Sequence, residues 1–185
     1  GYSDLVRSTA GKNVPLDKDT AAGPKTFETA LLAAGGFLRS LDLVMDGTVR
    51  NALALVRPPG HHAEASEARG FCVFNNVAVG AEHLLRRHGL ERVLVVDWDL
   101  HHGNGTQEIF YGDRQVLYFS THQYPAYPGT GALDEMGRGE GLGYTLNVPL
   151  QPRADDAFYV RIFREILSPI CLAFQPQLIL VSAGF

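Results

Sequence analysis

Two carboxylates and two imidazoles stand where an apolar run ends in this 185-residue chain. The run RVLVVD, residues 92–97, is followed by Asp99, His101 and His102. Charged groups are costly to bury unless they are paired or bound to a metal ion. Asp99 and His101 lie two residues apart, and on extended backbone such residues project to the same side. A carboxylate and an imidazole so placed are typical ligands of a divalent ion such as zinc.

The alternative is a hydrogen-bonded polar cluster without a metal, and a lone Asp-x-His pattern would favour it. That alternative must also explain a second histidine pair, His61 and His62, in the stretch RPPGHHA at 57–63. The prolines and the glycine predict a constrained loop that presents both rings. One ring could act as general base on a metal-bound water and the other as acid. Asp97 and Asn104 are candidates to hydrogen-bond these rings and fix their tautomers.

Apolar periodicity predicts the elements that must position these groups. Helices are expected at 26–46, 75–89 and 155–174, and buried strands at 51–56, 92–97, 116–120, 144–148 and 178–184. Near-continuous Val, Ile and Leu strands alternating with helices indicate an α/β fold, with a mostly parallel sheet and helices on both faces. Ligands of such folds bind beyond the carboxyl ends of the strands. We therefore expect the segments RPPGHHA, DLHHGNG and SAGF to meet at one edge of the sheet.

Bulk composition narrows the function classes. The chain is 45% apolar with a formal net charge of −4, so it has no basic excess to favour nucleic acid. It contains no apolar run long enough for a membrane span, and it begins without a signal-peptide pattern. Cys72 and Cys171 are far apart and in no metal or redox spacing. These features predict one domain, residues 1–185, in the reducing cytoplasm.

Six motifs in this order resemble the histone deacetylase family: RPPGHHA, GFCVFNN, VDWDLHHGNGTQ, YPGTG, NVPL and SAGF. The resemblance runs from about residue 26 to residue 185, and the Asn at position 104 is similar to the class II branch. The histone deacetylase family includes the bacterial histone-deacetylase-like amidohydrolases and the acetylpolyamine amidohydrolases. The resemblance implies a three-layer arginase/deacetylase-type fold. It also implies an amidohydrolase that removes acetyl or acyl groups from lysine side chains with one zinc ion.

The resemblance also implies roles for individual residues. The implied catalytic residues are His61, His62, Asp97 and Asn104, and the implied zinc ligands are Asp99 and His101. Asp97 would support His61, and Asn104 would support His62. The implied substrate-binding residues are Gly70, Phe71 and Tyr127. The two aromatic rings would form opposite walls of an acyl-lysine tunnel, although without the resemblance a core position is an equal alternative for both.

Two structural potassium or sodium sites are implied as well. One comprises Asp97, Asp99, His101, Ser120 and Thr121, and the other Phe110, Asp113, Val116 and Tyr144. An acidic residue, Asp17 or Asp19, is expected to hold the substrate backbone, with the choice between the two open.

The family pattern extends beyond this chain. It continues SAGF with an Asp, the third zinc ligand, and later with a tyrosine or histidine, and it begins with an earlier strand. We therefore expect a truncated domain, incomplete at both ends and inactive by itself. The expected substrate is an acyl-lysine protein or peptide, with an acetylated polyamine as the alternative. A non-catalytic acyl-lysine-binding module is a further alternative if the third ligand is missing. Direct nucleic-acid or membrane binding is not expected, and a homo-oligomer is left open.

Overall fold

The computed structural model describes residues 1–184 and divides them into two compact units. Unit 1 comprises Gly1–Gly89 and Asn104–Ile109. Unit 2 comprises Leu90–Gly103 and the chain from Phe110 onward. The last residue of the SAGF motif, Phe185, lies outside the described residues.

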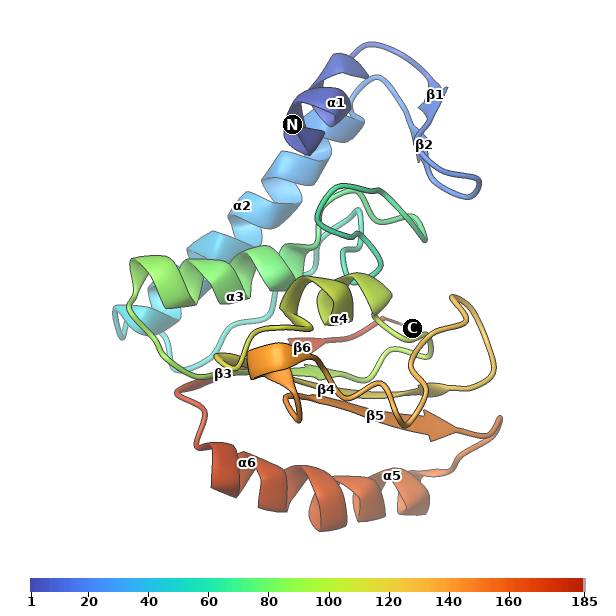
Figure 1. Ribbon diagram of the computed structural model, residues 1–185. Helices are drawn as coiled ribbons and strands as arrows, with labels where there is room; N and C mark the ends of the chain where they lie inside the picture. The colour runs from blue at the N-terminus through green and yellow to red at the C-terminus, as the bar shows by residue number, and fades with distance from the viewer. Residues whose placement is uncertain (185) are drawn as a thin grey trace. The chain divides into compact units, whose positions relative to one another are not determined.

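Unit 1 is mainly helical (Figure 1). Its elements are α1 (Tyr2–Ser8), the antiparallel pair β1 (Val14–Pro15) and β2 (Ala21–Ala22), α2 (Thr26–Met45), α3 (Asn76–Arg87) and the start of α4 (Asn104–Phe110). The helices predicted at 26–46 and 75–89 are confirmed as α2 and α3.

The ends of α3 follow from its sequence. The side chain of Asn75 caps the helix by accepting a hydrogen bond from the backbone N–H of Ala78, at 3.0 Å. Gly89, just beyond its end, has a φ of 68°, a left-handed conformation that favours glycine. Gly80 faces α2, where an added Cβ would overlap the ring of Phe37. The absence of a side chain at Gly80 therefore lets the two helices approach closely.

The 20-residue α2 is the longest helix, yet Glu28, Arg39 and Asp42 interrupt its apolar character. No helix in the described part of the chain combines the length and the hydropathy that crossing a bilayer requires.

The stretch NALALV does not form the strand that we predicted at 51–56. Leu53 is 83% exposed and Leu55 is 88% exposed, so this segment is not buried either. Apolar alternation suggested a strand, but a strand also needs a neighbour to accept its backbone hydrogen bonds. Within the described residues of unit 1, the only strands, β1 and β2, already pair with each other. The RPPGHHA loop is therefore not placed by a strand of the sheet.

Unit 2 contains a four-stranded parallel sheet in the order β5-β4-β3-β6. Its strands are β3 (Val93–Asp97), β4 (Val116–Gln123), β5 (Thr145–Leu150) and β6 (Leu178–Ser182). The other four strand predictions are thus confirmed. Asp97, the last residue of β3, lies opposite Ser120 of β4 and Ser182 of β6. The sheet therefore brings polar residues at the ends of β3, β4 and β6 into one row. Of the three segments that we expected to meet at this edge, DLHHGNG follows β3 and SAGF begins at the last residue of β6.

One face of this sheet packs against a long helical segment (Figure 1). The segment runs through α5 (Asp156–Ile162), a π-helical turn η2 (Phe163–Leu167) and α6 (Ser168–Phe174), where the sequence predicted a single helix. The core between them is formed by Leu94, Val96, Leu117, Phe119, Leu150, Ile162 and Leu167. A 3₁₀ turn, η1 (Gly139–Gly141), precedes β5. The buried core fixes β3, and so fixes the backbone from which Asp97 and Asp99 project.

Candidate active site

The tandem histidines lie buried side by side in unit 1. The ring centroids of His61 and His62 are 4.0 Å apart, and both residues are buried. The backbone carbonyl of His61 accepts hydrogen bonds from Gly105 N and Thr106 N, at 3.0 and 3.2 Å. His62 Nδ1 lies 2.8 Å from Asn104 Oδ1. The first turn of α4 therefore holds the loop, and the predicted pairing of His62 with Asn104 is present.

A chain of hydrogen bonds fixes the orientation of Asn104. Its Nδ2 donates to Glu64 Oε1 at 2.9 Å, and the same Glu64 oxygen accepts from Arg69 Nη1 at 2.9 Å. Since the carboxylate of Glu64 only accepts, the amide nitrogen of Asn104 must face it, and the amide oxygen must face His62. Nδ1 of His62 therefore carries the hydrogen, which leaves the lone pair of a neutral ring on Nε2. His62 is thereby prepared to accept a proton at Nε2.

The Gly70–Phe71 turn lies beside this pair. Gly70 has a φ of 56°, and a Cβ there would overlap the His62 ring, so both conformation and space require glycine. Gly70 N donates to Asp19 Oδ1 at 3.1 Å, and Phe71 N donates to Thr20 Oγ1 at 3.0 Å. The backbone of Phe71 is also left-handed, at a φ of 66°, and its side chain is 65% exposed. Phe71 is therefore not a core residue, and the Asp19 side chain holds this turn. That Asp17 or Asp19 holds the substrate backbone stays a prediction.

In unit 2, Asp99 and His101 follow β3 with their ligand atoms together. Asp99 Oδ1 accepts from the backbone N–H of His101 at 2.8 Å and lies 3.3 Å from His101 Nδ1. Two ligands each about 2.0 Å from one tetrahedral zinc ion would be about 3.3 Å apart, so this spacing fits a shared ion. A Cβ at Gly184 would overlap Asp99 Oδ2, so the glycine lets the chain after β6 pass beside the carboxylate.

The described residues supply two such ligands and no more. Within 1–184, no third His, Cys, Asp or Glu approaches Asp99 and His101 closely enough to complete a set of three. The ring of Tyr127 lies edge-on to that of His101, with centroids 6.0 Å apart. Tyr127 thus lies beside a proposed ligand, and its role as a wall of the substrate tunnel stays a prediction.

The first implied cation set lies at the ends of β3 and β4 and in the segment after β3. Asp97, Ser120 and Thr121 are fully buried, and Thr121 Oγ1 has no hydrogen-bond partner among the described residues. Tyr118 Oη donates to Gly103 O at 3.2 Å and lies 3.4 Å from Asp97 Oδ2. Burial raises the pKa of Tyr118 well above its usual range, so this phenol stays a donor. Thr121 Oγ1 is thus a buried oxygen without a partner among the described residues, and the cation at this set stays a prediction.

The second implied cation set is less telling. Its four residues lie at the end of α4, in the turn after it, at the start of β4 and before β5: Phe110, Asp113, Val116 and Tyr144. The Phe110 carbonyl accepts from Asp113 N at 3.0 Å, and the Tyr144 carbonyl accepts from Tyr118 N at 2.9 Å. A cation at this set stays a prediction.

Two further histidines of unit 2 are structural. His102 Nδ1 lies 2.8 Å from Thr130 Oγ1, and its ring lies 4.7 Å from that of His122. His122 Nε2 donates to the carbonyl of Gly131 at 2.8 Å, and burial lowers the pKa of this imidazole. Both rings are fully buried and neutral rings suffice for these bonds, so they fasten the loop around Thr130. No local pattern in the sequence indicates this role for His122.

Known protein families include one that matches nearly the whole chain. The family described as "Histone deacetylase domain" matches residues 2–185. The chain belongs to the histone deacetylase family.

Similar proteins include other family members from distant organisms. The chain is 49% identical over 183 residues to a "Probable deacetylase" of Archaeoglobus fulgidus, covering 99% of this chain and 51% of that protein. It is 51% identical over 168 residues to "Polyamine deacetylase HDAC10" of Homo sapiens, covering 88% of this chain and 25% of that protein. The chain thus spans about half the length of the first of these deacetylases and a quarter of the second.

The fold is also that of a solved histone deacetylase structure. The crystal structure of the HDA15 HD domain matches with a TM-score of 0.96 at 43% identity, covering 100% of this chain and 53% of that one. This likeness confirms the predicted α/β deacetylase-type fold with its parallel sheet.

Proposed function

We propose that the whole protein is a zinc-dependent deacetylase that hydrolyses acyl amides of lysine side chains. The observation that carries the proposal is the 3.3 Å spacing of Asp99 Oδ1 and His101 Nδ1 at the end of β3 in a histone deacetylase family member. A bound zinc ion would lower the pKa of its water towards about 7 and polarise the amide carbonyl. The third zinc ligand is not among the described residues.

The residues of unit 1 would move the protons of this reaction. His62 has its Nδ1–H held by Asn104, so Nε2 can take a proton from the attacking water and return it to the leaving amine. The Asn104 oxygen also stabilises the imidazolium that forms in between. His61, with its ring 4.0 Å away, would share this acid–base work. We further propose Asp97 as a catalytic residue.

Aromatic and small residues would bind the substrate. We propose Gly70, Phe71 and Tyr127 as substrate-binding residues: the exposed Phe71 ring offers apolar contact to the stem of an acyl-lysine, and Gly70 leaves space beside His62. A structural potassium or sodium ion bound by Asp97, Ser120 and Thr121 would neutralise the buried carboxylate.

We also propose a cytoplasmic location for the protein.

A second candidate substrate is an acetylated polyamine. The observation that favours it is the 51% identity to a protein named polyamine deacetylase. The two substrate classes differ in charge and length, since a polyamine has free cationic amines where a peptide has neutral backbone.

A substrate panel tests the proposal. The full-length protein, loaded with zinc, is assayed against acetyl-lysine peptides and N-acetylated polyamines, with His101→Ala as the control. We expect hydrolysis of acetyl-lysine peptides that the His101→Ala variant lacks. Hydrolysis of the polyamines alone would move the assignment to the second candidate. Hydrolysis of neither by the zinc-loaded protein would overturn both and favour an acyl-lysine-binding module.

A further inference from the structure

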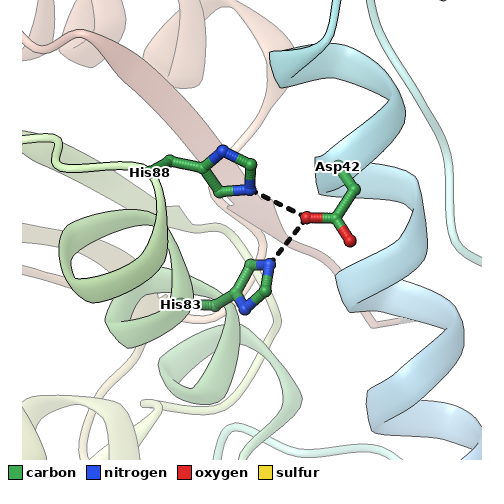
Figure 2. Close-up of side chains that lie close together, drawn as sticks. All are labelled: Asp42, His83 and His88. Carbon is green, nitrogen blue, oxygen red and sulfur yellow. Dashed lines mark hydrogen bonds and ion pairs between the residues drawn. The ribbon is translucent and has the colours of Figure 1, made fainter.

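A second group of ligand-type side chains lies in unit 1, outside the residues assigned above (Figure 2). Asp42 is in the last turn of α2, His83 is on α3, and His88 follows the last residue of α3. The Nε2 atom of His83 lies 2.7 Å from Asp42 Oδ1, and that of His88 lies 2.8 Å from the same oxygen. The two helices thus bring three potential ligand atoms to one point.

This convergence differs from an ordinary surface ion pair. In an ordinary ion pair, a carboxylate oxygen contacts one cationic side chain. Here the Nε2 atoms of two imidazoles, His83 and His88, both approach the same oxygen of Asp42. All three ligand atoms lie within 4.8 Å of one another. Two imidazoles and one carboxylate are a recurrent ligand set for divalent transition metals.

The group is also reachable and correctly charged. The side chains of His83, His88 and Asp42 are 15%, 22% and 29% exposed, so ions and water can reach them. The hydrogen bonds from the two histidines lower the pKa of Asp42 from 3.8 to about 2, so its carboxylate is ionised at neutral pH. Figure 2 shows its second oxygen directed away from both rings.

We propose that Asp42, His83 and His88 form a second binding site for a divalent transition-metal ion such as Zn²⁺, with water in the remaining positions. The present 2.7 and 2.8 Å spacings are hydrogen-bond lengths. Ligand atoms of one zinc ion lie about 3.0–3.4 Å apart, so each imidazole moves away from Asp42 Oδ1 by several tenths of an ångström on binding. Each neutral ring moves its N–H from Nε2 to Nδ1, which frees the Nε2 lone pair without net proton release. The bound ion would fasten the end of α2 to the end of α3.

Zinc stoichiometry of the full-length protein tests this site separately from the proposed catalytic site. In His101→Ala, which removes a proposed catalytic ligand, we expect one equivalent of zinc to remain. Adding Asp42→Asn or His83→Ala to that variant should remove this last equivalent. Asp46→Asn is the matched control, because this nearby acid bonds only locally, to Thr48 N at 2.9 Å.

Each outcome has a defined meaning. Loss of all zinc in His101→Ala alone, or retention of the last equivalent after Asp42→Asn, would overturn the second site. The three residues would then be a hydrogen-bonded clasp without metal. Melting curves in EDTA show whether each variant is folded, and His88→Gln gives a milder replacement if His83→Ala is not. His83→Ala alone should keep wild-type deacetylation, so failure of the second site leaves the proposed function intact.

Discussion

The two units hold their functional side chains in different ways. In unit 2, the backbone does the positioning: Asp97 ends a buried strand in register with its neighbours, and Asp99 and His101 follow directly. In unit 1, side chains do it: His62 depends on Asn104, which depends on Glu64 and Arg69. A ligand held by a sheet edge tolerates changes around it, whereas a histidine held by side-chain bonds is sensitive to each partner.

The largest effect is expected in unit 2. His101→Ala removes a proposed zinc ligand, and the lost Lewis acid should lower kcat/KM for acetyl-lysine peptides by on the order of a thousandfold or more. Because His101 is partly exposed and the sheet fixes its backbone, the melting temperature should hardly change. Zinc analysis, kinetics and thermal unfolding check this. Wild-type turnover with the full zinc content would refute the ligand assignment.

A smaller loss is expected when a partner in unit 1 is removed. Asn104→Ala frees the His62 ring to adopt the wrong tautomer, and misplaced general acid–base catalysis should lower kcat by about a hundredfold. Zinc content should stay unchanged, which separates this variant from His101→Ala. Glu108→Ala, an exposed change on the same helix, serves as the control. An unchanged kcat and pH–rate profile in Asn104→Ala would show that the hydrogen bonds from Arg69 through Glu64 to Asn104 do not position His62.

A steric test sharpens the same contrast. Gly70→Ala places a methyl group against the His62 ring, and overpacking should cost about 1–3 kcal/mol of unfolding free energy together with activity. Gly47→Ala is the matched control, because Gly47 has a similar left-handed φ of 77° but nothing within 4 Å of an added Cβ. Denaturant unfolding of both variants separates overlap from backbone strain. Equal losses would mean that only the backbone conformation matters at Gly70.

The smallest effect concerns acid stability. The pKa of Asp42 is lowered from 3.8 to about 2, so the folded protein binds fewer protons than the unfolded chain between these values. Its contribution is complete above pH 3.8 and is lost as the pH falls towards 2. The unfolding free energies of wild type and Asp42→Asn, measured in EDTA, should therefore converge below pH 4. A difference that stays constant down to pH 2 would contradict the His83 and His88 hydrogen bonds.

The sequence predicted the parts of the fold that local pattern controls. The β3 strand and the two ligand-type residues after it were readable from an apolar run that ends in Asp and His. The strand at 51–56 was wrong, because apolar alternation does not reveal whether a neighbouring strand exists. Asn104 was placed with His62 through family motifs, and the structure contains that bond.

The contacts that the sequence missed are tertiary. Glu64 and Arg69 stand close to the recognised motifs, but nothing local shows that Glu64 orients Asn104, forty residues away in the chain. Asp42 and His83 lie on separate helices, 41 residues apart, so only helix packing brings them together. Acidic and imidazole groups on helices are ordinarily solvated, and their spacing along the chain carries no signal.

Zinc removal and restoration in the full-length protein tests the central claim most directly. The protein is stripped with a chelator, titrated with zinc, and assayed with an acetyl-lysine peptide, with His83→Ala used in parallel to remove the second proposed site. We predict that the stripped protein is inactive and that one equivalent of zinc restores full turnover in His83→Ala. Full turnover by zinc-free protein would contradict the account.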